Sequence, residues 1–265
     1  MSKIHWVTNC MDCVEGLKLL KDESIDLTVT SPPYDNLRTY NGNIDQWNFD
    51  KFKEIAKELY RVTADGGVVV WIVADATIKG SETGTSFRQA LWFMDCGFNL
   101  HDTMIYAKAN PMPCKSKRYT PAFEYMFVFS KGQPKTFNPI MEDCKFAGKK
   151  SARTVIYADG TRKHYNKGFY KDTKVKRNVF EYNVGTGKGR GIKHPAVFPE
   201  QLANDHIVSW SNEGDVVLDP FSGSGTTHKM ALLNNRRFIG FEISQEYIDI
   251  ERKRLEDCGL WRYDY

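Results

Sequence analysis

The sequence has no long apolar run, and its first residues lack the pattern of a signal peptide. None of the 265 residues lies in an uninterrupted apolar stretch of the roughly 18 residues that span a bilayer. The opening segment, MSKIHWVTNC, lacks the hydrophobic centre of a secretory signal. Membrane and secreted proteins are both disfavoured, and we expect a cytoplasmic protein without a membrane partner.

Cysteine is scarce, and its spacing does not complete a metal site. Only two of the six cysteines, Cys10 and Cys13, are close together in the sequence, where they form the pattern CxxC. A tetrahedral zinc site needs four ligands, and no second CxxC or Cys/His pair supplies the other two. The spacing predicts reduced thiols with structural roles and no bound metal.

Two nucleotide-binding signatures are also missing. The segment DPFSGSGTT, at 219–227, is followed by His228 where a dinucleotide-binding GxGxxG motif has its third glycine. A phosphate-binding GK[ST] is absent as well. Binding of a pyrophosphate is therefore disfavoured, and with it a nicotinamide-dependent dehydrogenase.

The glycine segment nevertheless suits an adenosine-containing cofactor. Gly223 and Gly225 follow a predicted strand and precede a predicted helix, so the backbone can approach a ligand closely. Glu242 ends the next predicted strand, where a carboxylate can accept both hydroxyl groups of a ribose. Asp219 suits an ammonium or sulfonium group. A purely structural turn is the alternative, and Glu242 argues against it.

Predicted strands and helices alternate over most of the chain. Strands are expected at 24–30, at 68–73 after the glycine pair at 66–67, and at 99–108, 123–132, 215–221 and 236–242. Helices are expected at 52–63, 86–96, 198–210, 226–235 and 244–259. This alternation predicts one α/β domain with a largely parallel sheet.

Residues 133–193 interrupt the alternation. From 145 to 193 there are fourteen Lys or Arg residues and three acidic residues, although the net charge of the whole chain is only +4. Aromatic residues lie among these charges, including Tyr157, Tyr165, Phe169, Tyr170, Phe180 and Tyr182. Such a stretch favours contact with an anionic partner such as nucleic acid. The alternative is a solvated basic surface without a partner.

The residues SPPY, at 31–34, follow a predicted strand and cannot continue it. Neither proline can donate a hydrogen bond to a neighbouring strand. The segment is either a simple turn or a rigid loop that holds a hydroxyl group, backbone carbonyls and an aromatic ring for chemistry. The sequence alone allows both interpretations of this segment.

Four motifs together resemble a known enzyme family. SPPY at 31–34, FEYMFVFSKG at 123–132, HPAVFPEQL at 194–202 and DPFSGSGTT at 219–227 are similar to motifs of DNA methyltransferases that use S-adenosylmethionine and methylate exocyclic amino groups. Their order resembles that of the β class. The resemblance implies a Rossmann-like class I methyltransferase fold in circularly permuted order, with a mostly parallel twisted sheet, helices on both faces and a basic target-recognition insertion.

The resemblance also implies roles for individual residues. The catalytic motif is Ser31, Pro32, Pro33 and Tyr34. The cofactor-binding residues are Asp12, His194, Pro195, Asp219, Pro220, Phe221, Gly223, Ser224, Gly225, Thr226, Thr227 and Glu242. Asp12 is placed beside the adenine, although Met11 replaces the usual glycine before it. No metal takes part.

Residues that contact DNA are expected in and near the insertion. The candidates share a positive charge and are Arg38, Arg153, Arg162, Lys163, Lys174, Lys176, Arg177, Lys188 and Arg190. The expected organisation is a catalytic half at 1–132, a target-recognition insertion at 133–193 and a cofactor-binding half at 194–265. The resemblance implies double-stranded DNA as the partner, with base flipping to bring the target amino group into the site.

The target base and the biological setting are less well defined. Serine at the first position of SPPY resembles the subgroup of these enzymes that methylates cytosine N4, so we slightly favour cytosine N4 over adenine N6. An RNA methyltransferase and a catalytically silent DNA-binding subunit are further alternatives. The resemblance is compatible with a bacterial or phage-encoded enzyme, with or without a restriction endonuclease partner, and with a monomer or a homodimer.

Overall fold

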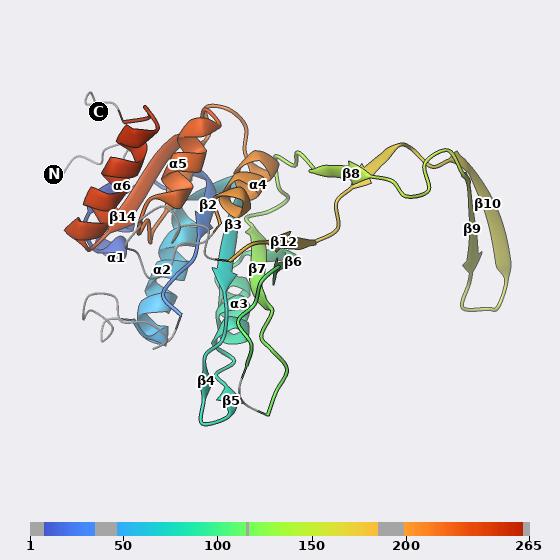
Figure 1. Cartoon of the computed structure of the whole chain (residues 1–265), viewed down its shortest axis with the longest axis horizontal. Helices are drawn as coiled ribbons and strands as arrows, with labels where there is room; N and C mark the ends of the chain where they lie inside the picture. The colour runs from blue at the N-terminus through green and yellow to red at the C-terminus, as the bar shows by residue number, and fades with distance from the viewer. Residues whose placement is uncertain (1–7, 35–46, 115–116, 185–198, 262–265) are drawn as a thin grey trace. The chain divides into compact units, whose positions relative to one another are not determined.

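The computed structural model describes residues 8–34, 47–114, 117–184 and 199–261 (Figure 1). The chain forms two compact units. One comprises Met1–Asn138 together with Asn178–Tyr265, and the other comprises Pro139–Arg177. The candidate site lies in the first, larger unit, which we call the main unit; the second is called the insertion unit.

An eight-stranded sheet forms the centre of the main unit. In sheet order its strands are β1 (Thr8–Cys10), β14 (Arg237–Glu242), β13 (Val216–Asp219), β2 (Ile25–Thr30), β3 (Thr63–Val73), β7 (Phe123–Ser130), β6 (Asn99–Lys108) and β12 (Val179–Tyr182). Strand β7 is antiparallel to β3 and β6, and the other neighbouring pairs are parallel. The predicted mostly parallel α/β sheet is confirmed.

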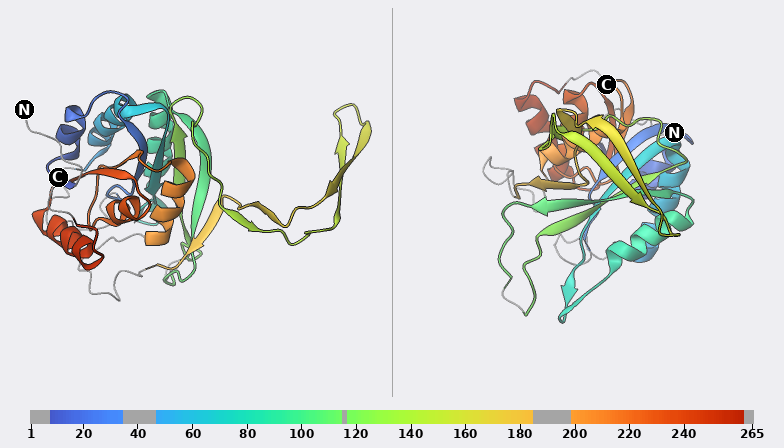
Figure 2. Two further views of the ribbon diagram at one scale, coloured as in Figure 1. Left: turned by 90° about the horizontal axis from the view of Figure 1, so that it is seen from above. Right: turned by 90° about the vertical axis from the view of Figure 1, so that its right-hand side faces the viewer.

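Six helices of the described chain cover the sheet. They are α1 (Cys13–Leu19), α2 (Phe49–Val62), α3 (Thr85–Asp95), α4 (Glu200–Trp210), α5 (Thr226–Leu233) and α6 (Gln245–Asp257). Helices α1, α2 and α3 pack side by side, as do α4, α5 and α6. Figure 2 shows the two groups on opposite faces of the sheet. The expected arrangement of helices on both faces is therefore present.

Helix α2 shows why the sequence folds in this way. Its apolar residues recur at helical spacing, and Phe52, Ile55 and Leu59 are completely buried. The Asn48 side chain accepts a hydrogen bond from the Lys51 backbone N–H and caps the first turn. The buried face of the helix joins an aromatic core against the sheet.

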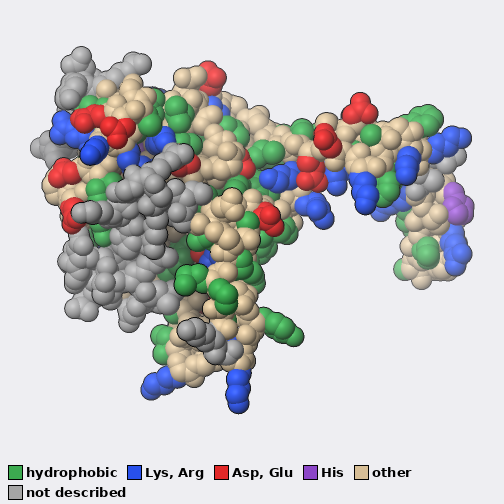
Figure 3. Space-filling model, viewed as in Figure 1, with side chains coloured by type: hydrophobic (Ala, Val, Ile, Leu, Met, Phe, Trp, Pro, Cys, Tyr) green, Lys and Arg blue, Asp and Glu red, His purple; other side chains and the backbone are tan. Residues whose placement is uncertain are grey.

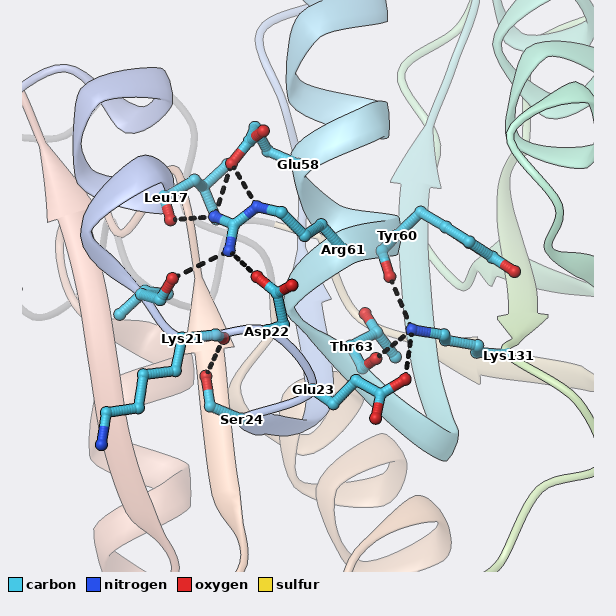
Figure 4. Close-up of polar contacts among 11 residues, drawn as sticks. Leu17, Lys21, Asp22, Glu23, Ser24, Glu58, Tyr60, Arg61, Thr63 and Lys131 are labelled. Carbon is cyan, nitrogen blue, oxygen red and sulfur yellow. Dashed lines mark hydrogen bonds and ion pairs between the residues drawn. The ribbon is translucent and has the colours of Figure 1, made fainter.

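Two basic side chains fasten the far end of α2 to the turn before β2 (Figure 4). The Arg61 guanidinium donates to the backbone carbonyls of Leu17 and Leu20 at 2.8 and 2.9 Å, and it also binds Asp22 and Glu58. Lys131 binds the carboxylate of Glu23 and the carbonyls of Tyr60 and Thr63. These contacts fix the start of β2, the strand that leads to Ser31.

The start of β3 differs from the prediction. The glycine pair at 66–67 was expected to separate a helix from a strand at 68–73, but the strand already begins at Thr63. Its pairing with β2 is irregular between Ile25 and Leu27, and Gly66 has a φ of +70°. Glycine accommodates this bulge because it adopts positive φ without strain.

The insertion unit, Pro139–Arg177, lies within the predicted target-recognition range of 133–193. Residues 178–182 belong to the main unit, where β12 pairs with β6. The reason is packing: Phe180 and Tyr182 are buried, and the Tyr182 hydroxyl donates to Asp205 at 2.8 Å. These two aromatic side chains therefore belong to the core and are not part of a basic surface.

The insertion unit consists of two antiparallel pairs of strands. Strand β8 (Met141–Asp143) pairs with β11 (Thr173–Val175), and β9 (Lys150–Ile156) pairs with β10 (Arg162–Phe169). None of its described side chains is buried. A further short hairpin, β4 (Thr77–Ile78) and β5 (Ser81–Glu82), belongs to the main unit. No helix among the described residues is long and apolar enough to cross a membrane.

Candidate active site

The carboxyl ends of two neighbouring strands bring the SPPY motif and the glycine segment together. Strands β2 and β13 are parallel neighbours, so the residues that follow them emerge at the same edge of the sheet. A cavity lies at this edge. Of the residues predicted from the sequence, it is lined by Asp12, Ser31, Pro32, Pro33, Tyr34, Pro220, Phe221, Gly223, Ser224, Thr226 and Glu242.

The SPPY segment is held by a chain of side-chain hydrogen bonds. The Ser31 hydroxyl donates to the Tyr34 hydroxyl at 2.9 Å, and the Tyr34 hydroxyl donates to the Glu124 carboxylate at 2.8 Å. The other carboxylate oxygen of Glu124 is 2.8 Å from the Lys108 ammonium. The prolines restrict the backbone between Ser31 and Tyr34. The hydroxyl and the aromatic ring are thus held in place at the cavity wall.

Asp219 ends β13 and is almost completely buried beneath the residues that follow it, 220–225, which we call the glycine loop. Its carboxylate accepts hydrogen bonds from the Thr30 hydroxyl at 2.6 Å and from the Phe221 backbone N–H at 3.0 Å. Burial raises the pKa of Asp219 to about 6, against the opposing effect of the hydrogen bonds from Thr30 and Phe221. The side chain therefore connects the end of β2 directly to the glycine loop. Contact with a cationic ligand group stays a prediction for Asp219.

Glu242 joins the glycine loop to the end of β14. One carboxylate oxygen accepts from the Gly223 backbone N–H at 3.0 Å, and the other accepts from the Ser244 backbone N–H at 2.9 Å. Burial raises the pKa of Glu242, and these two hydrogen bonds act in the opposite direction. The carboxylate therefore lies at the cavity wall, already surrounded by hydrogen-bond donors.

The glycine loop needs glycine at one position for two reasons. Gly225 has a φ of +75° at the start of α5, and a Cβ atom there would collide with the side chain of Glu251. Arg254 donates to the backbone carbonyl and the hydroxyl of Ser224. Thr227 is also buried beneath the loop, where its hydroxyl donates to the Val29 carbonyl at 3.2 Å.

Asp12 caps helix α1 at the edge of the cavity. Its carboxylate accepts from the Val14 backbone N–H at 2.9 Å and is 3.0 Å from the Lys51 ammonium. Cys13, which follows it, is buried, and burial raises the pKa of its thiol to about 12. This cysteine stays protonated at neutral pH. Among the described residues no cluster of His, Cys, Asp and Glu is placed to hold a metal ion.

Three charged residues of the site were missed by the sequence analysis. Glu124 and Lys108 lie on β7 and β6, and Lys51 lies on α2. Glu124 could have been found as a carboxylate within the otherwise apolar and aromatic segment FEYMFVF. Lys108 and Lys51 carry no comparable signal, because their partners are far away in the sequence.

The insertion unit holds several of the predicted DNA contacts on exposed strands. Arg153 lies opposite Tyr165 in the β9–β10 pair, and the ammonium of Lys163 is 5.4 Å from the centre of the Tyr165 ring. Arg162 is also exposed. Figure 3 shows Lys and Arg side chains spread along this unit.

The other residues predicted to contact DNA or the cofactor are either at the surface of the insertion unit or outside the described residues. Lys174 is paired with Glu142 at 3.0 Å, Lys176 is partly exposed and Arg177 is exposed. The remaining candidates lie outside the described residues: Arg38, Lys188, Arg190, His194 and Pro195. The roles of all these residues stay predictions.

Residues 25–253 match the N6_N4_Mtase family, which is described as DNA methylase. The chain belongs to this family. It is 54% identical over 245 residues to the orphan methyltransferase M.BamHII of Bacillus amyloliquefaciens, and the match covers 89% of this chain and 90% of the relative. It is 32% identical over 271 residues to the type II methyltransferase M.HinfI of Haemophilus influenzae, covering 93% and 67%.

Solved structures show the same fold. The PvuII DNA methyltransferase, described as cytosine-N4-specific, aligns with a TM-score of 0.71 and 23% identity over 100% of this chain and 91% of that one. The complex of M1.HpyAVI with S-adenosylmethionine aligns with a TM-score of 0.59 and 23% identity, covering 94% and 99%. The two solved structures show the fold, and the family identifies the chain as an S-adenosylmethionine-dependent DNA amino-methyltransferase, as expected.

The residues of the cavity fit this cofactor. Glu242 offers a carboxylate for ribose hydroxyls, and Phe221 offers an apolar ring at the cavity wall. The backbone at Gly223 and Ser224 carries no bulky side chain that would block a ligand. The apolar and acidic groups together match an adenosine carrying a positively charged sulfonium group.

Proposed function

We propose that the enzyme methylates the N4 amino group of cytosine in double-stranded DNA, and that Ser31 and Tyr34 hold the flipped base. The single observation that carries the proposal is the Ser31 hydroxyl, which lies at the wall of the cavity beside the glycine loop and is fixed by Tyr34 at 2.9 Å. Serine at this position is the feature that favours cytosine over adenine.

The chemistry requires activation of a poor nucleophile. The lone pair of an exocyclic amino nitrogen is delocalised into the base ring, and it becomes available as the nitrogen turns tetrahedral. Acceptors opposite the two N–H bonds favour that geometry, and the Ser31 hydroxyl oxygen and the Pro32 carbonyl are suited to this role. The cofactor, when bound, supplies an electrophilic methyl group.

Ser31 and Tyr34 together form what we call the clamp, and Tyr34 is suited to position the flipped base within it. The amino group of a paired base lies within the duplex, so the base must leave the stack to reach Ser31. The ring of Tyr34 offers a face for stacking, and the hydrogen bond to Glu124 fixes its orientation. Because the clamp is held before the base arrives, little reorganisation is needed in the transition state.

The predicted cofactor contacts follow from the same cavity. We assign the ribose hydroxyls to Glu242 and the adenine to the region of Asp12 and Phe221, which all line the cavity. Asp219 is assigned a supporting role, because its carboxylate holds the Phe221 N–H and the Thr30 hydroxyl. Thr227 and Gly225 support the loop from below.

The insertion unit is assigned to DNA recognition. Its exposed Arg and Lys side chains can neutralise phosphates, and a two-stranded ribbon such as β9–β10 is narrow enough for the major groove. In this proposal Arg153 and Lys163, which share one face of the ribbon, lie toward the bases. Arg162 on the opposite face contacts the DNA backbone, as do Lys174, Lys176 and Arg177. An endonuclease partner and the oligomeric state stay predictions, and the enzyme is assigned to the cytoplasm, where bacterial DNA lies.

Methyl transfer from labelled S-adenosylmethionine to unmethylated genomic DNA, followed by nucleoside digestion and mass spectrometry, tests the proposal. The expected product is N4-methylcytosine. N6-methyladenine would identify the alternative, which is favoured by a 29% identity to the DNA adenine methyltransferase YhdJ of Escherichia coli over 92% of this chain. No label in DNA, with the cofactor bound, would point to RNA or to a silent subunit.

A further inference from the structure

Methylation of an amino group held by Ser31 releases one proton, and the serine hydroxyl alone is not a clear acceptor for it. When the amino nitrogen forms its bond to the methyl carbon, it carries one proton more than the neutral product. A serine hydroxyl is a very weak base, so it can accept this proton only if it passes its own proton on at the same time. The inference that follows rests on the proposed function of Ser31.

The structure provides a continuous path from Ser31 to a carboxylate. The Ser31 hydroxyl donates to Tyr34 and the Tyr34 hydroxyl donates to Glu124, so both hydrogen bonds point in the direction of the acid. Their lengths, 2.9 and 2.8 Å, are those of ordinary hydroxyl hydrogen bonds. Ser31, Tyr34 and Glu124 all line the same cavity.

A lysine balances the charge of Glu124 at the end of this path. The Lys108 ammonium lies 2.8 Å from its second oxygen, and the two side chains are only 20% and 15% exposed. Tyr106 lies opposite Glu124 in the β6–β7 pair, and burial together with the nearby carboxylate raises the pKa of its hydroxyl. Tyr106 therefore stays neutral, and Lys108 supplies the compensating charge.

We propose that Glu124 is the terminal proton acceptor of amino methylation, and that it acts through Tyr34 and Ser31. The bond from nitrogen to the methyl carbon forms as the bond from sulfur to that carbon breaks. Ser31 takes one proton from the nitrogen and gives its own to Tyr34, which gives its proton to Glu124. The nitrogen loses one proton and the carboxylate gains one, which it later releases to water.

Three variants separate proton acceptance from support of the clamp. Glu124→Gln keeps an oxygen that accepts from Tyr34 but cannot take up a proton. Glu124→Asp keeps the carboxylate on a shorter side chain. Tyr34→Phe keeps the ring for stacking and removes the hydroxyl that links Ser31 to the acid. Glu23→Gln is the matched control, because Glu23 is also paired with a lysine, Lys131 at 3.0 Å, and lies outside the cavity.

Single-turnover methyl transfer at saturating DNA and cofactor is the readout, with both dissociation constants measured in parallel. Glu124→Gln and Tyr34→Phe are expected to slow transfer roughly 100-fold, the usual scale of general acid–base catalysis, with both dissociation constants unchanged. Glu124→Asp should recover part of the rate, and Glu23→Gln should match the wild type.

Two results would overturn the inference. Transfer by Glu124→Gln at the wild-type rate would show that the carboxylate accepts no proton. Equal losses in Glu124→Gln and Glu124→Asp, accompanied by weaker DNA binding, would reduce Glu124 to a support for Tyr34. Either result leaves the proposed function intact as long as the wild-type enzyme forms N4-methylcytosine in DNA. A wild-type enzyme that does not form this product would refute the proposed function itself.

Discussion

Asp219 and Lys174 show how differently the two units use charge. Asp219 is 1% exposed and accepts hydrogen bonds from Thr30 and Phe221. Lys174 in the insertion unit has a side chain that is 47% exposed and is paired with Glu142 at the surface. A surface pair of this kind contributes only about 0–1 kcal/mol, so the lysine can exchange its partner for a phosphate.

This contrast suggests a division of labour between the units. Buried and mutually bonded groups of the main unit hold a fixed geometry, as catalysis requires. Exposed charges of the insertion unit adapt to a polyanion, as DNA binding requires. Variants in the main unit should therefore change the rate, the cofactor affinity or the stability, and variants in the insertion unit should change the affinity for DNA.

The largest effect is expected for Ser31→Ala. Loss of the hydroxyl removes an acceptor from the amino group, and the single-turnover rate should fall roughly 100- to 1,000-fold. Cofactor affinity, measured by calorimetry, should stay within about twofold of the wild type, because the Ser31 hydroxyl is assigned to the base and not to the cofactor. Ser24→Ala, which removes a turn hydroxyl bonded to the Lys21 carbonyl, is the control. A comparable loss of cofactor affinity in Ser31→Ala would contradict the assignment.

Asp219→Asn should change the pH dependence of stability. Folding raises the pKa of this buried acid from 3.8 to about 6, so its stabilising contribution is present below about pH 4 and is lost as the pH rises through 6. Relative to the variant, the unfolding free energy of the cofactor-free wild type should drop by roughly 2 kcal/mol between pH 4 and 7.

Urea unfolding at several pH values measures this difference. Asparagine keeps an oxygen for the Thr30 hydroxyl and the Phe221 N–H, so the variant is expected to fold. Asp257→Asn, at an exposed site on the last helix, provides the matched control. Parallel pH curves for the wild type and Asp219→Asn would show that burial does not control this carboxyl group.

Asp219→Ala should weaken cofactor binding more than it slows transfer. The change removes both hydrogen bonds that hold the glycine loop to the end of β2, and two such bonds correspond to roughly a 30-fold loss of affinity. Calorimetric titration with S-adenosylmethionine gives the affinity. A variant with normal cofactor affinity and a low maximal rate would reverse the roles proposed for Asp219 and Ser31.

The smallest effect is expected in the insertion unit. Replacing Lys174, Lys176 and Arg177 together by alanine should weaken DNA binding roughly tenfold, because three charges that can neutralise phosphates are lost. The plot of log affinity against log salt should become shallower by about 2 to 3 units of slope. The control replaces Lys18, Lys21 and Lys253, which are exposed on the main unit. An unchanged salt slope would show that these three residues form a solvated surface and do not contact DNA.

Local motifs allowed much of the fold and part of the site to be predicted. The glycine loop and SPPY each follow a buried strand, and both segments have a local pattern that fixes their type. Glu242 could be placed because it ends the next strand. The structure shows these residues in one cavity, while their individual roles stay predictions.

What could not be predicted depends on pairing between distant residues. Glu124 meets Lys108 because β6 and β7 are antiparallel neighbours, and Asp12 meets Lys51 because α1 packs against α2. No local spacing encodes these contacts. The strand at 179–182 was missed for a related reason: the surrounding lysines concealed its pattern, which is decided by the burial of two aromatic rings.

Single-turnover methyl transfer as a function of DNA concentration tests the division of labour most directly. The triple insertion variant should reach the wild-type rate once DNA saturates it, whereas Ser31→Ala should stay slow at every concentration. If the insertion variant stays slow at saturation while Ser31→Ala recovers with more DNA, chemistry and DNA binding are not divided between the two units as proposed.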